Sequence, residues 1–345
     1  MKHSAYIILI LTAFSIHMQA ECLYMTIETL HPGEATFAPK AQDILLVNNT
    51  ATQPEDWGHS TRLSTTADDI ELTVRADSLP LMCLIQTADQ LQDYGYFRSV
   101  SLLEHTQNSG DFFSTHQLTP HAVDSLCALY QVDAIIALNR IAVIDQLSDL
   151  YIDDSDSYIA ALDVSIVSSW SVHHQGSAVS QSVSRTDTLS WEAESSIADH
   201  AVRQLPQRSE AATHAAFYTG TRFVQHILPY WTCEDRYVFR NSNKALRSAY
   251  EDFCHRRWAQ AGEAFEQILH TEKKVRIRAY AAANAAFCAE ILGHIEQAIQ
   301  LAGQAQTLFT QLYTEDDADN YTYITNYLNR LNIKKNELPE LRRQI

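Results

Sequence analysis

Two apolar runs of the sequence each end in asparagine. Asn48 and Asn49 close the run 44–49, and Asn139 follows the run 133–138. Short apolar runs bounded by turn residues are typical of central strands buried on both faces. In open α/β sheets, ligands bind at the carboxyl ends of such strands. Asn48, Asn49 and Asn139 are therefore a candidate ligand site.

A second candidate is a group of tyrosines near the carboxyl end of the chain. Tyr321, Tyr323 and Tyr327 crowd an expected helix over 320–331. Aromatic clusters can anchor a peptide in a helical groove. They also fill the seam between packed domains, and both interpretations stay open. We take Tyr321 and Tyr323 as candidate binding residues.

Motifs for catalysis, metal binding or phosphate binding are absent from the sequence. There is no G-x-S-x-G, H-E-x-x-H or EF-hand loop. The 15 histidines are scattered, His173 and His174 read as a solvated hairpin turn, and 153–156 reads as an acidic turn. The nine glycines lack phosphate-loop spacing. We assign no catalytic residue, metal or cofactor, and a non-enzymatic protein is favoured over an enzyme.

Charge and composition limit the partners. The 345 residues include 42 acidic and 25 basic side chains, which gives a formal net charge of −17. Nucleic acid is disfavoured because no excess of Lys and Arg is present to neutralise phosphates. Hydrophobic residues make up 46% of the chain and charged residues 19%, which is enough to bury a core. The length fits two domains.

The first twenty residues have the pattern of a signal peptide. Lys2 precedes an apolar run over 5–14, and Ala20 offers a small residue at a cleavage point. Cys22 follows directly and is a candidate lipid-attachment site. Glu21 departs from the small residue that lipoprotein processing requires before the cysteine, so ordinary cleavage after Ala20 stays open. We expect an exported protein of the periplasm or outer membrane, with membrane contact only through an N-terminal lipid.

The region 21–230 predicts an α/β domain with an appended β-hairpin. Alternation of apolar and polar residues over 162–172 indicates a strand with one wet face, and 178–191 reads as its partner. A mixed-sheet α/β sandwich follows. The other expected strands are 24–30, 43–49, 96–103 and 133–138, and the expected helices are 80–94, 120–132, 193–204 and 207–228.

The region 231–345 predicts only helices. Two helical pairs are expected, over 244–269 and 278–309, and the inner run that begins at Trp258 aligns with the one at Ile295. This pattern resembles tetratricopeptide repeats, with a generic helical bundle as the alternative. We expect a capping helix over 320–331, preceded by a loop at 315–319.

Two cysteines fall on neighbouring expected helices. Cys254 and Cys288 could form a disulfide in an exported protein, and the favoured alternative is that both are small buried residues.

Several stretches resemble an uncharacterised family of exported proteins of Gram-negative anaerobes, many of them lipoproteins. The matching stretches are 27–34, 44–49, 133–138, 234–237, 241–245 and 258–261. The resemblance implies an N-terminal α/β domain followed by tetratricopeptide-like helices. It implies no activity.

These observations favour a non-enzymatic cell-envelope protein whose helical repeat region binds a protein or peptide. Two other functions stay open. One is a small-ligand binder or enzyme that uses the carboxyl edge of the sheet at Asn48 and Asn139. The other is a subunit of a larger surface assembly, which an exposed apolar patch would indicate.

Overall fold

The computed structural model describes residues 22–37, 41–64, 73–108, 110–312 and 314–345. The expected signal peptide lies outside the described residues. The chain forms two compact units. Residues 33–228 form one, which we call the sheet unit, and residues 22–32 join 229–343 in the other, which we call the helical unit.

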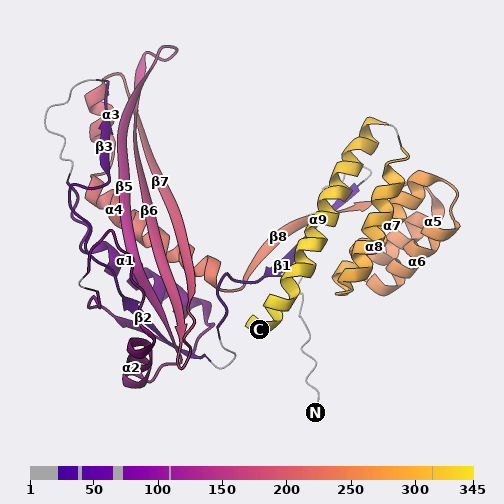
Figure 1. The fold of residues 1–345 in the computed structure, drawn as a ribbon. Helices are drawn as coiled ribbons and strands as arrows, with labels where there is room; N and C mark the ends of the chain where they lie inside the picture. The colour runs from indigo at the N-terminus through magenta and orange to yellow at the C-terminus, as the bar shows by residue number, and fades with distance from the viewer. Residues whose placement is uncertain (1–21, 38–40, 65–72, 109, 313) are drawn as a thin grey trace. The chain divides into compact units, whose positions relative to one another are not determined.

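A mixed six-stranded sheet organises the sheet unit (Figure 1). Parallel pairs join β2 to β4 and β5, and β3 to β5, while β5, β6 and β7 are antiparallel. The fold class predicted from the sequence is confirmed. The strands are β2 (Asp43–Asn48), β3 (His59–Arg62), β4 (Ser99–Leu103), β5 (Ala134–Ile152), β6 (Ser157–His174) and β7 (Gln181–Ser195).

Helices cover both faces of the central strands, which explains the continuous apolar runs. Ile44 and Leu46 join the core on the α1 and α4 side, whereas Leu45 and Val47 pack with α2 on the other face. The helices are α1 (Leu79–Tyr94), α2 (Pro120–Tyr130), α3 (Ala198–Gln204) and α4 (Arg208–Ile227).

Strand β5 is much longer than expected. The expected strand 133–138 covers only its first part, because β5 runs for 19 residues and pairs with β6 along nearly its whole length. Beyond Asn139 the strand is interrupted by polar residues, among them Arg140, Asp145 and Gln146, and the sequence therefore did not show one continuous strand. The expected hairpin of 162–172 and 178–191 is confirmed as β6 and β7.

The helical unit begins with a two-stranded ribbon. β1 (Cys22–His31) pairs antiparallel with β8 (Tyr230–Phe239), so that Met25 lies opposite Arg236. β1 was expected within the α/β region, and the structure groups it with the helices instead. β8 was not predicted as a strand, because its charged and polar residues interrupt the alternation of apolar and polar positions that is expected of a half-buried strand.

Helices α5 to α8 pack in sequence order, each against the next. Ala261 and Ala298, which the repeat alignment places at close crossings, are both fully buried. α7 is buried on every side, so its apolar residues show no amphipathic pattern. The helices are α5 (Lys244–Cys254), α6 (Trp258–Thr271), α7 (Val275–Ile291) and α8 (Ile295–Phe309).

The last helix corrects one expectation. Residues 315–319 are not a loop but the first turn of α9 (Glu315–Gln344). Thr314 and Asp317 form a capping box there, and acidic side chains favour a helix N-terminus because of its dipole. Arg276 of α7 pairs with Asp317 at 2.6 Å. The expected helix 320–331 is therefore the middle of a longer one.

The cysteine expectations hold only in part. Cys254 and Cys288 are both free, in line with the favoured alternative, but only Cys288 is buried and Cys254 is exposed. None of the described helices is both long enough and apolar enough to cross a bilayer.

Candidate functional site

Asn49 and Asn139 are in contact at the sheet edge, as their positions in the sequence predicted. Asn49 Nδ2 donates to Asn139 Oδ1 at 2.9 Å and to the His116 carbonyl at 2.7 Å. Asn139 Nδ2 donates to Ser171 Oγ at 2.8 Å. All three asparagine side chains are buried. Because these amides hydrogen-bond one another and neighbouring groups, they fill the edge, and we favour a structural role for them.

The other polar motifs of the sheet unit are also structural. His173 is not in a solvated turn: it lies in β6, buried, with Nε2 2.7 Å from Ser171 Oγ, and burial lowers its pKa. His174 ends the same strand, and its Nε2 contacts the Thr36 carbonyl at 3.2 Å. Residues 153–156 form the exposed turn between β5 and β6, as predicted.

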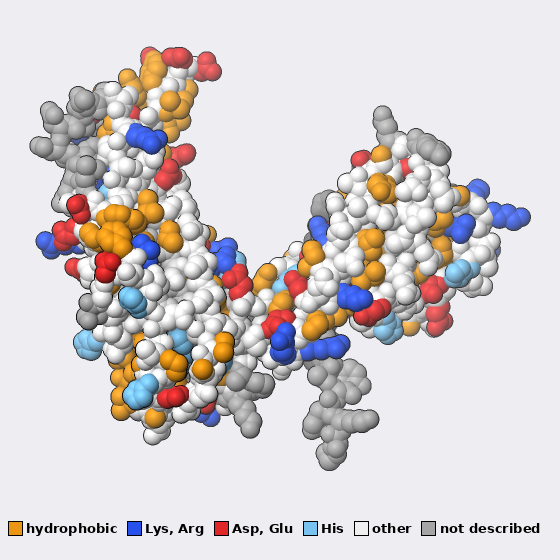
Figure 2. Space-filling model, in the orientation of Figure 1, with side chains coloured by type: hydrophobic (Ala, Val, Ile, Leu, Met, Phe, Trp, Pro, Cys, Tyr) orange, Lys and Arg blue, Asp and Glu red, His pale blue; other side chains and the backbone are white. Residues whose placement is uncertain are grey.

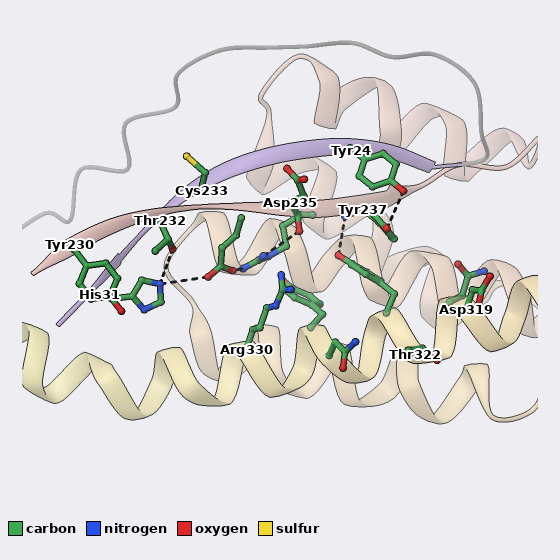
Figure 3. Close-up of a pocket in the computed structure, with 16 residues that line it drawn as sticks. Tyr24, His31, Tyr230, Thr232, Cys233, Asp235, Tyr237, Asp319, Thr322 and Arg330 are labelled. Atoms are coloured by element: carbon green, nitrogen blue, oxygen red, sulfur yellow. Dashed lines mark hydrogen bonds and ion pairs between the residues drawn. The ribbon is translucent and has the colours of Figure 1, made fainter. Parts of the chain in front are cut away.

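In the helical unit, α9 and β8 enclose a groove of about 940 Å³ (Figure 3). Tyr323, one of the predicted binding residues, lines it together with Tyr327. Tyr321 is not among the lining residues and is exposed. The ring of Tyr323 stacks on Tyr237 of β8 with centroids 4.1 Å apart. The tyrosine cluster therefore joins helix to strand and forms part of the groove wall.

The groove follows the edge of β8 rather than one of its faces. Its lining includes six consecutive residues of the strand, from Thr232 to Tyr237. Successive side chains of a strand point to opposite faces, so a surface that touches all of them must run along the edge. The opposite wall consists of α9 residues between Asp319 and Arg330.

The edge of β8 that faces away from β1 offers backbone groups. Tyr237 N–H donates to Tyr323 Oη at 2.9 Å, and Phe239 N–H donates to Asn284 Oδ1 at 2.8 Å. These donors point away from β1, and in an antiparallel pair this orientation recurs at every second residue. The backbone groups of Trp231, Cys233 and Asp235 therefore lie on the same side. β8 pairs with β1 alone among the described strands.

A buried charge network lies behind β8. Arg236 Nε and Nη2 each donate to Glu290 of α7 at 3.0 Å, and both side chains are at most 2% exposed. Tyr327 Oη donates to Glu290 at 2.8 Å, and Lys334 Nζ at 3.2 Å. Burial opposes ionisation of Glu290, but Arg236 outweighs it and leaves the pKa of this carboxyl below its usual value. The network ties β8, α7 and α9 together.

His31 closes one end of the groove. Its Nδ1 lies 2.9 Å from Glu337 of α9, and its Nε2 lies 3.0 Å from Thr232 and 3.6 Å from Glu234. The ion pair with Glu234 is the main cause that raises the pKa of His31, against the opposing effect of burial. His31 in turn is the main cause that lowers the pKa of Glu234, to about 2.

This arrangement predicts a pH-dependent stability of the helical unit. Because the folded pKa of His31 is raised, its contribution is complete below the unfolded pKa of about 6.5. That contribution is lost as the pH rises through the folded value. The free energy of unfolding should therefore fall as the pH rises above about 6.5, and His31→Asn should remove that part of the fall. An equal fall in His31→Asn, measured by urea unfolding, would contradict the assignment.

Sequence reasoning missed the residues that build this groove, namely His31, Arg236, Glu290 and Arg330. One signal was available for Glu290, which is a lone acid inside the alanine-rich run of α7. A buried carboxylate needs a cationic partner. Nothing in the sequence identified Arg236 as that partner.

Metal binding has no support in the described part of the chain, where no group of three His, Cys, Asp or Glu side chains could hold an ion. The groove offers hydrogen-bonding backbone, aromatic rings and charged side chains. Such a set suits non-covalent binding.

Two protein-family models match the chain. The model of a domain of unknown function, DUF8603, matches residues 41–239, which is more than half of the sequence. The chain belongs to this uncharacterised family. A second domain of unknown function, DUF6340, matches residues 247–333, from α5 into α9. The DUF8603 match thus spans the described sheet and β8, and the DUF6340 match contains most of the helices.

Among solved structures, the chain is similar to a Helicobacter pylori protein named as a homologue of the neuraminyllactose-binding hemagglutinin. The identity is 9%, and the match covers 56% of this chain and 90% of that one, with a TM-score of 0.24. A score this low carries no structural argument. No curated protein matches the sequence.

Proposed function

We propose that this DUF8603 protein binds an extended segment of a partner protein along the edge of β8 that faces away from β1, at Trp231, Cys233 and Asp235, before the point where Tyr323 takes the N–H of Tyr237. The bound segment would add a third strand to the β1–β8 ribbon, with α9 as the wall that holds its side chains. Strand addition of this kind takes affinity from backbone hydrogen bonds and specificity from side-chain pockets. The observation that carries the proposal is the groove along the β8 edge.

The dimensions of the groove support an extended occupant. Six residues of β8 line it, a length of roughly 17 Å at about 3.3 Å per strand residue. The α9 residues of the wall span 319 to 330, which is also roughly 17 Å at about 1.5 Å per helical residue. Both walls thus match a strand of about five or six residues.

Contacts within the chain connect the walls of the groove. The bond from Tyr237 N–H to Tyr323 and the Arg236–Glu290 pair hold β8 at a set distance from α9 and α7. A preformed site binds more tightly because less conformational entropy is lost. These contacts favour a binding surface over a packing defect.

The inner face of the helical repeats, our first expectation for the binding surface, is less suitable. Phe239 of β8 stacks on Tyr280 of α7, and α7 is buried on every side. The chain itself fills that face. A second hollow, of about 580 Å³, lies over Gln300, Gln304 and Thr307 of α8. It lacks a strand edge, so we favour the groove.

The cellular setting is a further part of the proposal. The signal-like residues 1–20 support export to the cell envelope, where the partner would be met, with tetratricopeptide-like helices as the scaffold. Ordinary cleavage after Ala20 and lipid attachment at Cys22 are the two alternatives that we propose for the mature N-terminus. Mass spectrometry of its N-terminus distinguishes a free Glu21 from a diacylglyceryl group on Cys22.

Proline at the β8 edge tests the binding mode. Cys233→Pro removes an outward N–H without touching a β1–β8 hydrogen bond, so peptide affinity should fall about tenfold or more. The probe is a fluorescein-labelled, eight-residue peptide of Ser, Thr and Val, measured by fluorescence anisotropy. The matched control is Glu28→Pro, which lies opposite Cys233 on the outer edge of the ribbon.

The expected result is loss of affinity in Cys233→Pro and near-normal affinity in Glu28→Pro. Circular dichroism and urea unfolding show whether both variants fold. Equal affinity in the two variants would exclude addition at the β8 edge. No binding to the unmodified chain at millimolar peptide would contradict the proposed function.

A further inference from the structure

The groove has charges of opposite sign at two separate points along α9. Figure 3 shows Arg330 rising from α9 toward β8 in the middle of the view, while Asp319 lies toward the end marked by Tyr24 and Tyr237. Asp235 of β8 is a second exposed acid of the lining, but its side chain points away from α9 in the same view. An occupant must therefore meet a cation at one point of the groove and the carboxylate of Asp319 at another.

The guanidinium of Arg330 differs from the other cations of the groove. Arg236 is held by Glu290 and Glu234, and Lys334 is held by Glu290. Arg330 donates no hydrogen bond to any described residue. Arg330 acts on Glu234 through its positive charge, which helps to lower the pKa of that carboxyl. Its fork of five donors suits a carboxylate, which it can bind through two parallel hydrogen bonds.

The acidic end favours a cation in the same way. Asp319 is exposed in the first turns of α9 and makes no hydrogen bond or ion pair within the described residues. Asp235 takes no part at this end, because it accepts from Thr26 Oγ1 through Oδ1 at 2.7 Å and its side chain points away from α9 in Figure 3. A basic side chain of the occupant would therefore meet the carboxylate of Asp319 there.

The distance between Arg330 and Asp319 determines how many positions separate the two charged residues of the bound segment. Arg330 and Asp319 lie three helical turns apart, roughly 16 Å at about 5.4 Å per turn. On a strand, side chains an even number of positions apart share a face. Residues four positions apart lie roughly 13 Å from each other, and the flexible Arg and Lys side chains span the remainder.

The direction follows from the chain course. α9 runs opposite to β8, because Tyr323 contacts Tyr237 while Arg330 lies near Glu234, further back along the strand. A segment that pairs antiparallel to β8 would pass Asp319 first and Arg330 later. Antiparallel pairing is slightly more stable per residue than parallel pairing.

We propose that the segment bound by the groove carries a basic residue and, four positions later, a carboxylate, and that it pairs antiparallel to β8. This inference rests on the proposed function. Asp319 binds the basic side chain, and Arg330 binds the carboxylate. The carboxylate comes from an Asp or Glu side chain or from the C-terminus of the partner.

Three amidated eight-residue peptides of Ser, Thr and Val test the charge order. One carries Lys and then Glu four positions later, one carries the same residues in reverse order, and one is neutral. With the full chain, anisotropy should give about tenfold tighter binding of the Lys-first peptide than of the reversed one. A fourth peptide ends in a free carboxylate at the Glu position and distinguishes the two sources of this group.

Charge exchange in the protein gives the decisive comparison. The double variant Asp319→Lys, Arg330→Glu should prefer the reversed peptide, whereas Arg330→Gln alone should reduce the preference to less than about threefold. Lys335→Gln is the control, because Lys335 is an exposed cation of the same helix that does not line the groove. Its preference should not change.

The outcomes separate the two proposals. Equal affinity for both charge orders, combined with loss of neutral-peptide binding in Cys233→Pro, would overturn this inference and leave the proposed function intact. A preference that the double variant does not reverse would also overturn it. If no peptide binds the unmodified chain, both proposals fail.

Discussion

Replacing Glu290 with alanine should lower the free energy of unfolding of the helical unit by about 3–5 kcal/mol. The carboxylate of Glu290 accepts hydrogen bonds from Arg236, Tyr327 and Lys334 inside the unit. Its loss leaves the buried guanidinium of Arg236 without its bidentate partner, and Glu234, 2.6 Å away, compensates only in part. An unpaired buried charge costs several kcal/mol because it loses hydration.

Urea unfolding followed by tryptophan fluorescence measures this effect, since Trp231 and Trp258 lie in the helical unit. Glu263→Ala is the control, because Glu263 is an exposed acid of α6 and should cost at most about 0.5 kcal/mol. A cost for Glu290→Ala no larger than that of the control would show that the network does not hold β8 in place. The preformed groove would then lose its support.

A further prediction concerns Arg236 and Glu290 replaced together. Replacing both Arg236 and Glu290 with methionine removes the two charges together and keeps apolar volume. Since no charge is left unpaired, the double variant should be more stable than Glu290→Ala. This comparison separates the cost of an orphaned charge from the cost of lost packing.

Replacing Trp170 with alanine should destabilise the sheet unit by about 3–5 kcal/mol. Trp170 lies in β6, is fully buried, and stacks on Phe223 of α4 with ring centroids 3.8 Å apart. Its removal leaves a cavity between the sheet and α4 that the surrounding side chains fill only in part. Thermal unfolding of the sheet unit measures the loss.

Tyr94→Ala is the matched control for Trp170→Ala. Tyr94 is an aromatic residue of the same unit at the end of α1, and it is 46% exposed. Its loss should shift the transition little, by about 0.5 kcal/mol. Similar shifts for both variants would mean that the contact between β6 and α4 is not central to the core.

The two predictions concern different parts of the proposal. The Glu290 variant tests whether the groove is held in shape, and the Trp170 variant tests the core of the sheet unit, which has no role in peptide binding. Trp170→Ala should therefore leave the affinity of the Ser, Thr and Val peptide unchanged under conditions where both units are folded.

Local sequence patterns predicted most of the regular elements. The apolar runs 44–47 and 134–138 lie in β2 and β5 because strands buried on both faces need continuous apolar side chains. The small residues Ala261 and Ala298, which the alignment placed at close helix crossings, are both fully buried. In each case the signal and the element lie within one short stretch of chain.

Predictions made from charged residues were wrong where contacts with distant elements determine the surroundings of those residues. The acids at 315–319 suggested a loop, yet they begin a helix whose cap and partner Arg276 offset their charge. The segment 230–239 suggested no strand, because Thr232, Glu234 and Arg236 face a polar interior rather than an apolar one. Both errors concern polar residues that become favourable only beside partners from other elements.

For the candidate site, the sequence alone determined Tyr323 as a residue of interest and brought the asparagines to one sheet edge. Only the tertiary structure decided that those asparagines satisfy one another and that the groove lies elsewhere. β1 meets β8 across about two hundred residues of chain, as the pairing of Met25 with Arg236 shows. A strand edge, and the buried pair of Arg236 and Glu290 behind it, arise from such distant contacts, which no local periodicity records.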